Sequence, residues 1–235
     1  MSSIAENLSR IHTQIAEACA RAHRSPSEVR LMAVSKLHPV EALLEAYAAG
    51  HRLFGENRVQ EFQEKSHSLS NLADLEVHLI GPLQNNKTNR AAELFHAIDT
   101  VDSLKLATRL NTAALALNKQ LPIYIEVKLS HEDSKHGLQP GELPALLDAI
   151  SPLESLLAVG LMTVPPWPAD LANAGAEARP YFQHLRRLRD ESVAQHPTLT
   201  GLSMGMSNDF TAAIEEGSTC VRIGTAIFGK RQPPV

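Results

Sequence analysis

The sequence predicts an α/β fold, a single (β/α)8 TIM barrel with an extra N-terminal helix, over residues 1–235. Three observations favour this fold. Short apolar runs of strand length alternate with longer segments whose apolar residues recur at helical spacing. Eight such runs fit into the 235 residues, which is about the length that eight βα units need. No linker of distinct composition interrupts the chain, so we expect one domain.

The composition is that of an ordinary globular protein. Hydrophobic residues make up 43% of the chain and charged residues 20%, which excludes a disordered chain. The net charge of −4 provides no basic field, so we expect neither a nucleic-acid partner nor a membrane partner. Cys19 and Cys220 are too few for a disulfide framework or a cysteine zinc site. Without a signal-peptide core or an apolar run of spanning length, we expect a cytoplasmic protein.

The first predicted element is an amphipathic helix over residues 3–22. Its apolar face is formed by residues at helical spacing, namely Ile4, Leu8, Ile11 and Ile15. Ser25-Pro26-Ser27 then interrupts the chain before the first strand. This helix precedes the strand and helix alternation and is therefore additional to the eight βα units.

The remaining elements alternate to the end of the chain. The predicted strands are residues 30–36, 52–55, 77–80, 97–101, 123–127, 157–162, 200–204 and 219–223. The predicted helices are residues 39–50, 58–66, 87–95, 103–118, 141–150, 176–192 and 209–216, so the last strand has no helix after it. The irregular stretch 164–175 is expected to form a loop over the barrel mouth. A doubly wound open sheet is the alternative fold, because strand counts from one sequence can be wrong by one or two.

Lys36 ends the first predicted strand, after the apolar run Leu31-Met-Ala-Val34. In a barrel, the carboxyl ends of all strands meet at one mouth, where such folds carry their chemistry. A lysine at this position can therefore be aimed into a cleft. The alternative is a strand-end lysine whose amine reaches solvent along its aliphatic stem.

Two turns near the end of the chain predict a phosphate site. Gly205 and Gly224 each follow a predicted strand, and Ser207 and Thr225 lie beside them. Glycine lets backbone N–H groups approach an anion closely, and a hydroxyl adds another donor. The loops after strands seven and eight form the common phosphate site of such barrels. Turn glycines with capping hydroxyls are the alternative interpretation.

Arg222 interrupts the apolar eighth strand, on the same side as Cys220 and Gly224. A buried guanidinium needs an acceptor, so a structural ion pair with a carboxylate at the barrel rim is one interpretation. An amine beside a phosphate cradle suits pyridoxal 5′-phosphate, whose aldehyde condenses with lysine. It equally suits a Schiff-base aldolase acting on a phosphorylated sugar. The residues alone do not separate these two functions.

A cluster of metal-ligating residue types lies in the loop after the fifth strand. It contains His131, Glu132, Asp133 and His136. Their spacing matches no established ligand geometry, and mixed charge before a glycine is typical of a solvated turn. We therefore assign no metal site.

Motifs along nearly the whole chain resemble those of the YggS/PROSC family of pyridoxal phosphate homeostasis proteins. The matching segments are Ala33-Val-Ser-Lys36, Phe54-Gly-Glu-Asn57, His78-Leu-Ile-Gly-Pro-Leu-Gln84 with Asn86-Lys87, Asp133-Ser-Lys-His-Gly137, Gly160-Leu-Met162, Ser203-Met-Gly-Met-Ser207, Gly217-Ser-Thr219 and Val221-Arg-Ile-Gly-Thr-Ala-Ile-Phe-Gly229. One such motif would be weak, whereas eight in order are specific. Asn208 departs from the family pattern, in which an aspartate is common at this position.

The resemblance implies a fold-type III pyridoxal 5′-phosphate protein of the alanine racemase type. It implies that the cofactor is held as a Schiff base on Lys36, with Arg222 near the ring nitrogen. Phosphate contacts are implied from Ser207, Gly224 and Thr225. The pocket is expected to include Asn57 and Ser203 as well.

The resemblance also implies a function in intracellular vitamin B6 homeostasis, that is, buffering or delivering the cofactor without catalytic turnover. Racemases of this type add a β domain that supplies a second base, and we expect none here because seven residues follow Phe228. An amino-acid racemase or decarboxylase is the alternative, but two-sided proton transfer needs two positioned bases and Lys36 is the one base evident in the sequence. We expect a monomer whose partners are apo-forms of pyridoxal-phosphate enzymes. Lys128, Lys135 and Lys230 are candidates for a second cofactor site.

Overall fold

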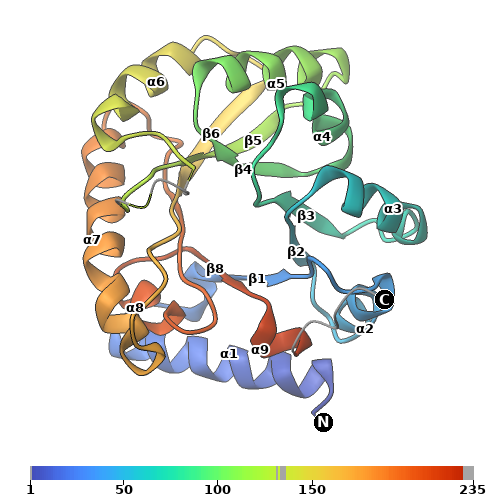
Figure 1. Ribbon diagram of the computed structural model, residues 1–235, viewed down its shortest axis with the longest axis vertical. Helices are drawn as coiled ribbons and strands as arrows, with labels where there is room; N and C mark the ends of the chain where they lie inside the picture. Colours follow the sequence, from blue (N-terminus) through green and yellow to red (C-terminus); the bar gives the residue numbers. More distant parts are fainter. Residues whose placement is uncertain (1, 131, 133–135, 230–235) are drawn as a thin grey trace.

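The computed structural model describes residues 2–130, 132 and 136–229, and it contains a closed barrel of eight parallel strands (Figure 1). Neighbouring strands pair in sequence order, and the last pairs with the first. The strands are β1 (Arg30–Val34), β2 (Leu53–Glu56), β3 (Glu76–Leu79), β4 (Ala97–Val101), β5 (Leu121–Glu126), β6 (Leu156–Met162), β7 (Gly201–Ser203) and β8 (Cys220–Ile223). The predicted (β/α)8 barrel is confirmed, and the open sheet is excluded because β1 and β8 are hydrogen-bonded.

The helices form the outer layer of the barrel (Figure 1). They are α1 (Ile4–Arg21), α2 (Val40–Ala48), α3 (Val59–Leu69), α4 (Thr88–Leu94), α5 (Leu104–Ala116), α6 (Leu143–Ile150), α7 (Ala174–Ser192), α8 (Phe210–Glu215) and α9 (Thr225–Phe228). The extra helix α1 begins with a capping box between Ser3 and Glu6 and packs against α8 and α9. Within the part of the chain that the structure describes, no helix is both long and apolar enough to cross a membrane.

The main apolar core lies between the strands and the helices, where Leu and Ile side chains from both layers are buried. The interior of the barrel contains a separate and smaller apolar cluster of Met32, Leu53 and Cys220. Gly160 and Gly201 leave room there for the ring of Tyr124: a Cβ on either glycine would lie under 3 Å from a ring atom. Polar side chains are also buried, among them His78, Asp99 and Ser203.

Two local differences from the predicted elements affect the site. β1 ends at Val34 rather than at Lys36, because the chain turns at Leu37, whose φ of 62° is left-handed. β8 is followed by the short helix α9, although no helix was predicted there. Four residues are too few to show a helical period in the sequence, so the pattern did not predict this helix.

Candidate functional site

A cavity of about 660 Å³ lies at the carboxyl ends of the strands, a size suited to one small molecule. All but one of the predicted site residues line it, although they come from four different strand ends and turns. These residues are Lys36, Asn57, Ser207, Arg222, Gly224 and Thr225. The exception is Ser203, described below. The barrel therefore brings into one place residues that are up to 189 positions apart in the sequence, as the difference between 225 and 36 shows.

The Lys36 amine lies in the wall of this cavity and donates a hydrogen bond to Asn57 Oδ1 at 3.4 Å. Asn57 follows β2, the strand paired with β1. Gly81 makes this arrangement possible, because a Cβ there would lie 2.3 Å from the backbone oxygen of Asn57. Lys36 is half-buried, so its amine faces the cavity rather than extending along the outer surface.

The backbone on both sides of Lys36 is held by an ion cluster of Glu56, Glu61 and Lys65, here called the Lys65 cluster. The Lys65 amine lies 2.8 Å from one oxygen of each carboxylate. It also donates to the carbonyl of Ser35 at 3.1 Å. The Ser35 hydroxyl donates to Glu56 Oε1 at 2.8 Å, so the residue before Lys36 is fixed by two contacts.

The residue after Lys36 is fixed by the same cluster. The backbone N–H of Leu37 donates to Glu61 Oε1 at 2.5 Å. Leu37 has a φ of 62°, which costs a side-chain-bearing residue on the order of 1 kcal/mol or more. Strain of this kind persists where surrounding contacts hold it, and the Lys65 cluster supplies them. Lys36 is therefore presented on a turn whose two flanking residues are both anchored.

Two glycine turns, after β7 and after β8, form the part of the cavity wall beside the Lys36 turn, because β8 is paired with β1. Gly205 has a φ of 98°, and a Cβ there would lie 2.6 Å from Ala213 Cβ, so this position requires glycine. Ser207 follows in the same turn. Gly224 precedes the first residue of α9, Thr225. The first N–H groups of a helix have no partner within it, so hydroxyl and amide donors meet at this side of the cavity.

Arg222 lies at the base of the cavity and is 5% exposed. Its Nη1 donates to the Ser203 carbonyl at 2.5 Å and to the Ser203 hydroxyl at 2.8 Å. Its Nη2 donates to the Thr163 carbonyl at 2.8 Å. These acceptors differ from the rim carboxylate that was one interpretation of the sequence. Burial lowers the pKa of Arg222, while nearby Asp99 opposes that effect.

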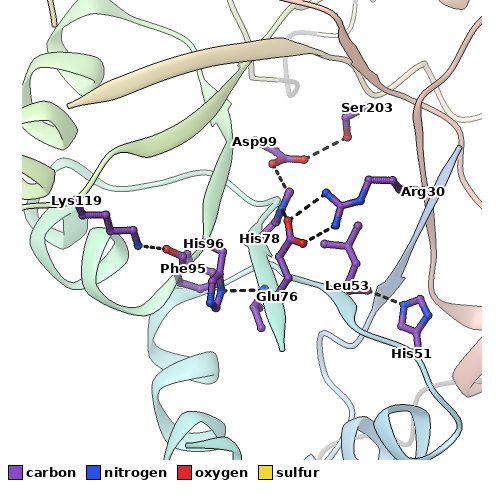
Figure 2. A network of polar contacts seen from close by, with 11 residues as sticks. Arg30, His51, Leu53, Glu76, His78, Phe95, His96, Asp99, Lys119 and Ser203 are labelled. Atoms are coloured by element: carbon purple, nitrogen blue, oxygen red, sulfur yellow. Dashed lines mark hydrogen bonds and ion pairs between the residues drawn. The ribbon is translucent and has the colours of Figure 1, made fainter. Parts of the chain in front are cut away.

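Ser203 is not among the residues that line the cavity, and its hydroxyl contacts Arg222 and Asp99 instead. Its side chain is fully buried, and its hydroxyl donates to Asp99 Oδ2 at 3.2 Å (Figure 2). The family resemblance implied Ser203 in the cofactor pocket, at the start of the motif that ends at Ser207. Ser203 is the last residue of β7 and lies deeper in the barrel than the turn that follows.

Glu126 is a site residue that the sequence analysis missed. It ends β5, which is four strands from β1 in the closed barrel, and it lines the cavity from that side. Burial raises the pKa of its carboxyl to about 7, although Arg222 opposes the rise. The inward alternation of Tyr124 and Glu126 in β5 was the signal that could have identified it.

The loop after β6 borders the cavity mouth with Val164, Pro166, Trp167 and Pro168. Its position agrees with the loop expected there. Trp167 is 73% exposed although it belongs to the cavity wall. The loop thus places a large aromatic surface at the entrance.

The candidates for a second cofactor site are only partly described. Lys128 lines the same cavity as Lys36. Lys135 and Lys230 lie outside the described residues, as do His131 and Asp133 of the loop considered for a metal. Among the residues that the structure does describe, no group of three His, Cys, Asp or Glu side chains could hold a metal ion.

Comparisons with known proteins identify the family. Residues 7–232 match the family described as "Alanine racemase, N-terminal domain". The pyridoxal phosphate homeostasis protein of Vibrio alginolyticus is 46% identical over 234 residues, covering 98% of this chain and 99% of that protein. The chain belongs to the pyridoxal phosphate homeostasis protein family. A further member, from Pseudomonas aeruginosa, is 45% identical over 231 residues, or 98% of this chain and 97% of its own length.

Solved structures agree with this family assignment. PipY of Synechococcus elongatus PCC7942, solved with PLP bound, is 41% identical with a TM-score of 0.84, and the match covers 97% of this chain and all of PipY. Alanine racemase of Clostridium difficile 630 has a TM-score of 0.72 at 14% identity, over 100% of this chain and 58% of the racemase. That second likeness shows the fold alone. The family resemblance inferred from the motifs is confirmed.

Proposed function

We propose that this chain binds pyridoxal 5′-phosphate on Lys36 and carries it to other proteins without catalytic turnover. The observation that supports the proposal best is the convergence of three features on one cavity. These are an anchored amine at Lys36, two donor-rich glycine turns and the guanidinium of Arg222. The relatives that are pyridoxal phosphate homeostasis proteins, and the structure of PipY with PLP bound, support the same cofactor.

The residues present fit the cofactor. Bound pyridoxal 5′-phosphate supplies an aldehyde that condenses with a primary amine and a ring that can withdraw electrons. Lys36 provides the amine, and Asn57 orients it by accepting its hydrogen bond. Ser207 and Thr225 provide hydroxyl donors for the phosphate, and Gly224 lets the backbone approach it.

Arg222 supports a carrier rather than a catalyst. A permanent cation beside the ring nitrogen disfavours protonation of that nitrogen, because two positive charges repel. The unprotonated ring withdraws electrons poorly, which disfavours transamination of amino acids. We propose that the barrel acts as a monomer and that its partners are apo-forms of pyridoxal-phosphate enzymes.

The cofactor assignment is tested by titrating the protein with pyridoxal 5′-phosphate and recording visible absorbance. We expect a new band, and borohydride should fix the cofactor on a peptide that contains Lys36. Lys36→Ala should lose the band while remaining folded by circular dichroism. Lys128→Ala is the matched control, because it removes another amine from the same cavity and should keep the band. A colourless wild-type protein would contradict the proposal.

Delivery is tested by mixing loaded protein with an apo-transaminase. We expect transaminase activity to recover and the visible band of the carrier to fall by a corresponding amount. If the carrier keeps its cofactor while the apo-enzyme remains inactive, storage is supported instead of delivery.

Glu126 favours a second candidate function, an amino-acid racemase. A racemase needs two acid–base groups on opposite sides of the substrate carbon. Lys36 and Glu126 come from strands on opposite sides of the barrel, and both line the cavity. The test is incubation of loaded protein with L-alanine in deuterium oxide. If wild-type protein incorporates deuterium at the α-carbon and Glu126→Gln does not, the racemase is supported. The carrier proposal predicts that neither protein incorporates deuterium.

A further inference from the structure

The interior of the barrel contains a continuous chain of polar side chains that begins at Arg222, here called the interior polar chain. The Ser203 hydroxyl accepts from Arg222 Nη1 and donates to Asp99 Oδ2. Asp99 Oδ1 lies 3.0 Å from His78 Nδ1, and His78 Nε2 lies 2.8 Å from Glu76 Oε1. Figure 2 shows the part of this chain from Ser203 through Asp99 and His78 to Glu76, with the contacts as dashed lines.

The interior polar chain ends at the other mouth of the barrel. Glu76 accepts two hydrogen bonds from the guanidinium of Arg30, the first residue of β1. The side chains of Arg30 and Glu76 are 50% and 35% exposed. The chain therefore runs from solvent at the amino ends of the strands to the cavity at their carboxyl ends.

Charges alternate along this chain. Burial opposes the charged form of His78, but the carboxylates of Asp99 and Glu76 outweigh it and raise its pKa to about 9. The hydrogen bond from His78 lowers the pKa of Glu76 to about 2, with burial opposing. Asp99 is fully buried and lies between the imidazolium and Ser203. The Asp99 carboxylate is linked to Arg222 by two hydrogen bonds through the Ser203 hydroxyl.

This arrangement fixes the guanidinium from its inner side. The Ser203 carbonyl, the Ser203 hydroxyl and the Thr163 carbonyl hold Nη1 and Nη2, so the plane of the group is defined by β6 and β7. The Ser203 hydroxyl can accept a hydrogen bond from Arg222 only if its own O–H points elsewhere. That O–H donates a hydrogen bond to Asp99. Asp99 thus decides the direction of the hydroxyl that holds Arg222.

We propose that Ser203 and Asp99 are positioning residues that hold the Arg222 guanidinium in the plane in which it meets the ring nitrogen of the cofactor. The inference rests on the proposed function, because the ring nitrogen belongs to bound pyridoxal 5′-phosphate. Neither residue touches the cofactor, and each acts through Arg222. Their replacement should change the electronic state of the ring more than the fold.

The experiment uses pyridoxal 5′-phosphate labelled with nitrogen-15 in the ring, bound to the full chain and observed by NMR. Ser203→Ala removes the hydroxyl that holds Arg222. Asp99→Asn keeps the shape but has a single acceptor oxygen, so it cannot accept from both His78 and the Ser203 hydroxyl as Asp99 does. In both variants we expect the ring-nitrogen signal to move toward the protonated form, and we expect binding about tenfold weaker, the effect of about one lost hydrogen bond to a charged group.

Ser218→Ala is the matched control. Ser218 is also a fully buried serine, and its hydroxyl contacts the carbonyls of Leu202, Met204 and Cys220. Its replacement should leave the ring-nitrogen signal at the wild-type position. If Ser203→Ala and Asp99→Asn bind the cofactor with the wild-type signal, the positioning role is wrong. If wild-type protein takes up no pyridoxal 5′-phosphate, the proposed function fails instead, and the two failures are distinguishable.

Discussion

Single side chains determine what the cavity can bind and what it can do with a ligand. Arg222 is buried against two strand ends, and the Ser203 hydroxyl links its guanidinium to Asp99 by hydrogen bonds. The guanidinium is therefore held in place with its charge available to the cavity. Ser207 and Thr225, by contrast, contribute neutral donors that suit an anion. Separate substitutions should distinguish these two roles.

Arg222→Gln should give the bound cofactor a weak activity that the wild type lacks. Glutamine retains an amide donor for the carbonyls of Ser203 or Thr163 but removes the positive charge. The ring nitrogen can then be protonated, and the ring withdraws electrons more strongly. We expect slow formation of pyridoxamine phosphate from added alanine, measured by chromatography. Loss of the cofactor without this activity would indicate that Arg222 binds the phosphate instead.

Ser207→Ala should weaken binding of pyridoxal 5′-phosphate by about 1–3 kcal/mol, the range for one hydrogen bond to a charged group. Binding of pyridoxal, which has no phosphate, should change little. The measurement is isothermal titration of both compounds with both proteins. Equal weakening for the two compounds would place the phosphate away from the Ser207 turn.

At the scale of elements, α3 does more than cover the barrel. It carries Glu61 and Lys65, which together with Glu56 of β2 hold the turn on which Lys36 lies. The strained φ of Leu37 is maintained by this helix, because Glu61 accepts the Leu37 N–H. The position of the Lys36 amine is thus set by an element that does not itself contain the lysine.

Lys65→Met should destabilise the protein by about 3–5 kcal/mol, since it leaves two carboxylates without their buried partner. It should also slow the capture of pyridoxal 5′-phosphate, because the turn at Lys36 loses an anchor. Urea unfolding and stopped-flow absorbance measure the two effects. Arg90→Met is the control: its pair with Glu93 is partly exposed, at 33% and 54%, and should contribute under about 1 kcal/mol. A variant as stable and as fast as wild type would contradict the role of the Lys65 cluster.

Most helices and strands could be predicted from the sequence, whereas the contacts that hold the site residues in place could not. The alternation of apolar runs located all eight strands, and the shared mouth of a barrel then grouped Lys36 with Asn57 and Arg222. The alternation of apolar runs does not predict how deep a residue lies inside the barrel, so Ser203 was assigned to the pocket wall. The left-handed turn at Leu37 was equally hidden, because it depends on contacts from a distant helix.

For the whole molecule, the polar interior makes stability depend on pH. The folded-state pKa of His78 is raised from 6.5 to about 9, so its contribution to stability is fully present below about pH 6.5. That contribution is lost as the pH rises through about 9. It follows from the burial of His78 between Glu76 and Asp99 inside the barrel.

Wild-type protein should therefore lose more unfolding free energy than His78→Gln between about pH 7 and about pH 10. The extra slope approaches about 1.4 kcal/mol per pH unit, the value for one proton. Urea unfolding at several pH values measures it. Parallel pH profiles for the two proteins would mean that His78 is neutral in the folded state.

The loop at the cavity mouth has a consequence for observing this protein. Trp167 is the one tryptophan in the sequence, and it stands at the cavity entrance between two prolines, which restrict its backbone. The tryptophan fluorescence of the chain therefore originates at the place where a ligand enters. A cofactor that absorbs near the emission of tryptophan should quench it on arrival and restore it on departure. The unmodified chain thus carries its own optical reporter of loading and transfer.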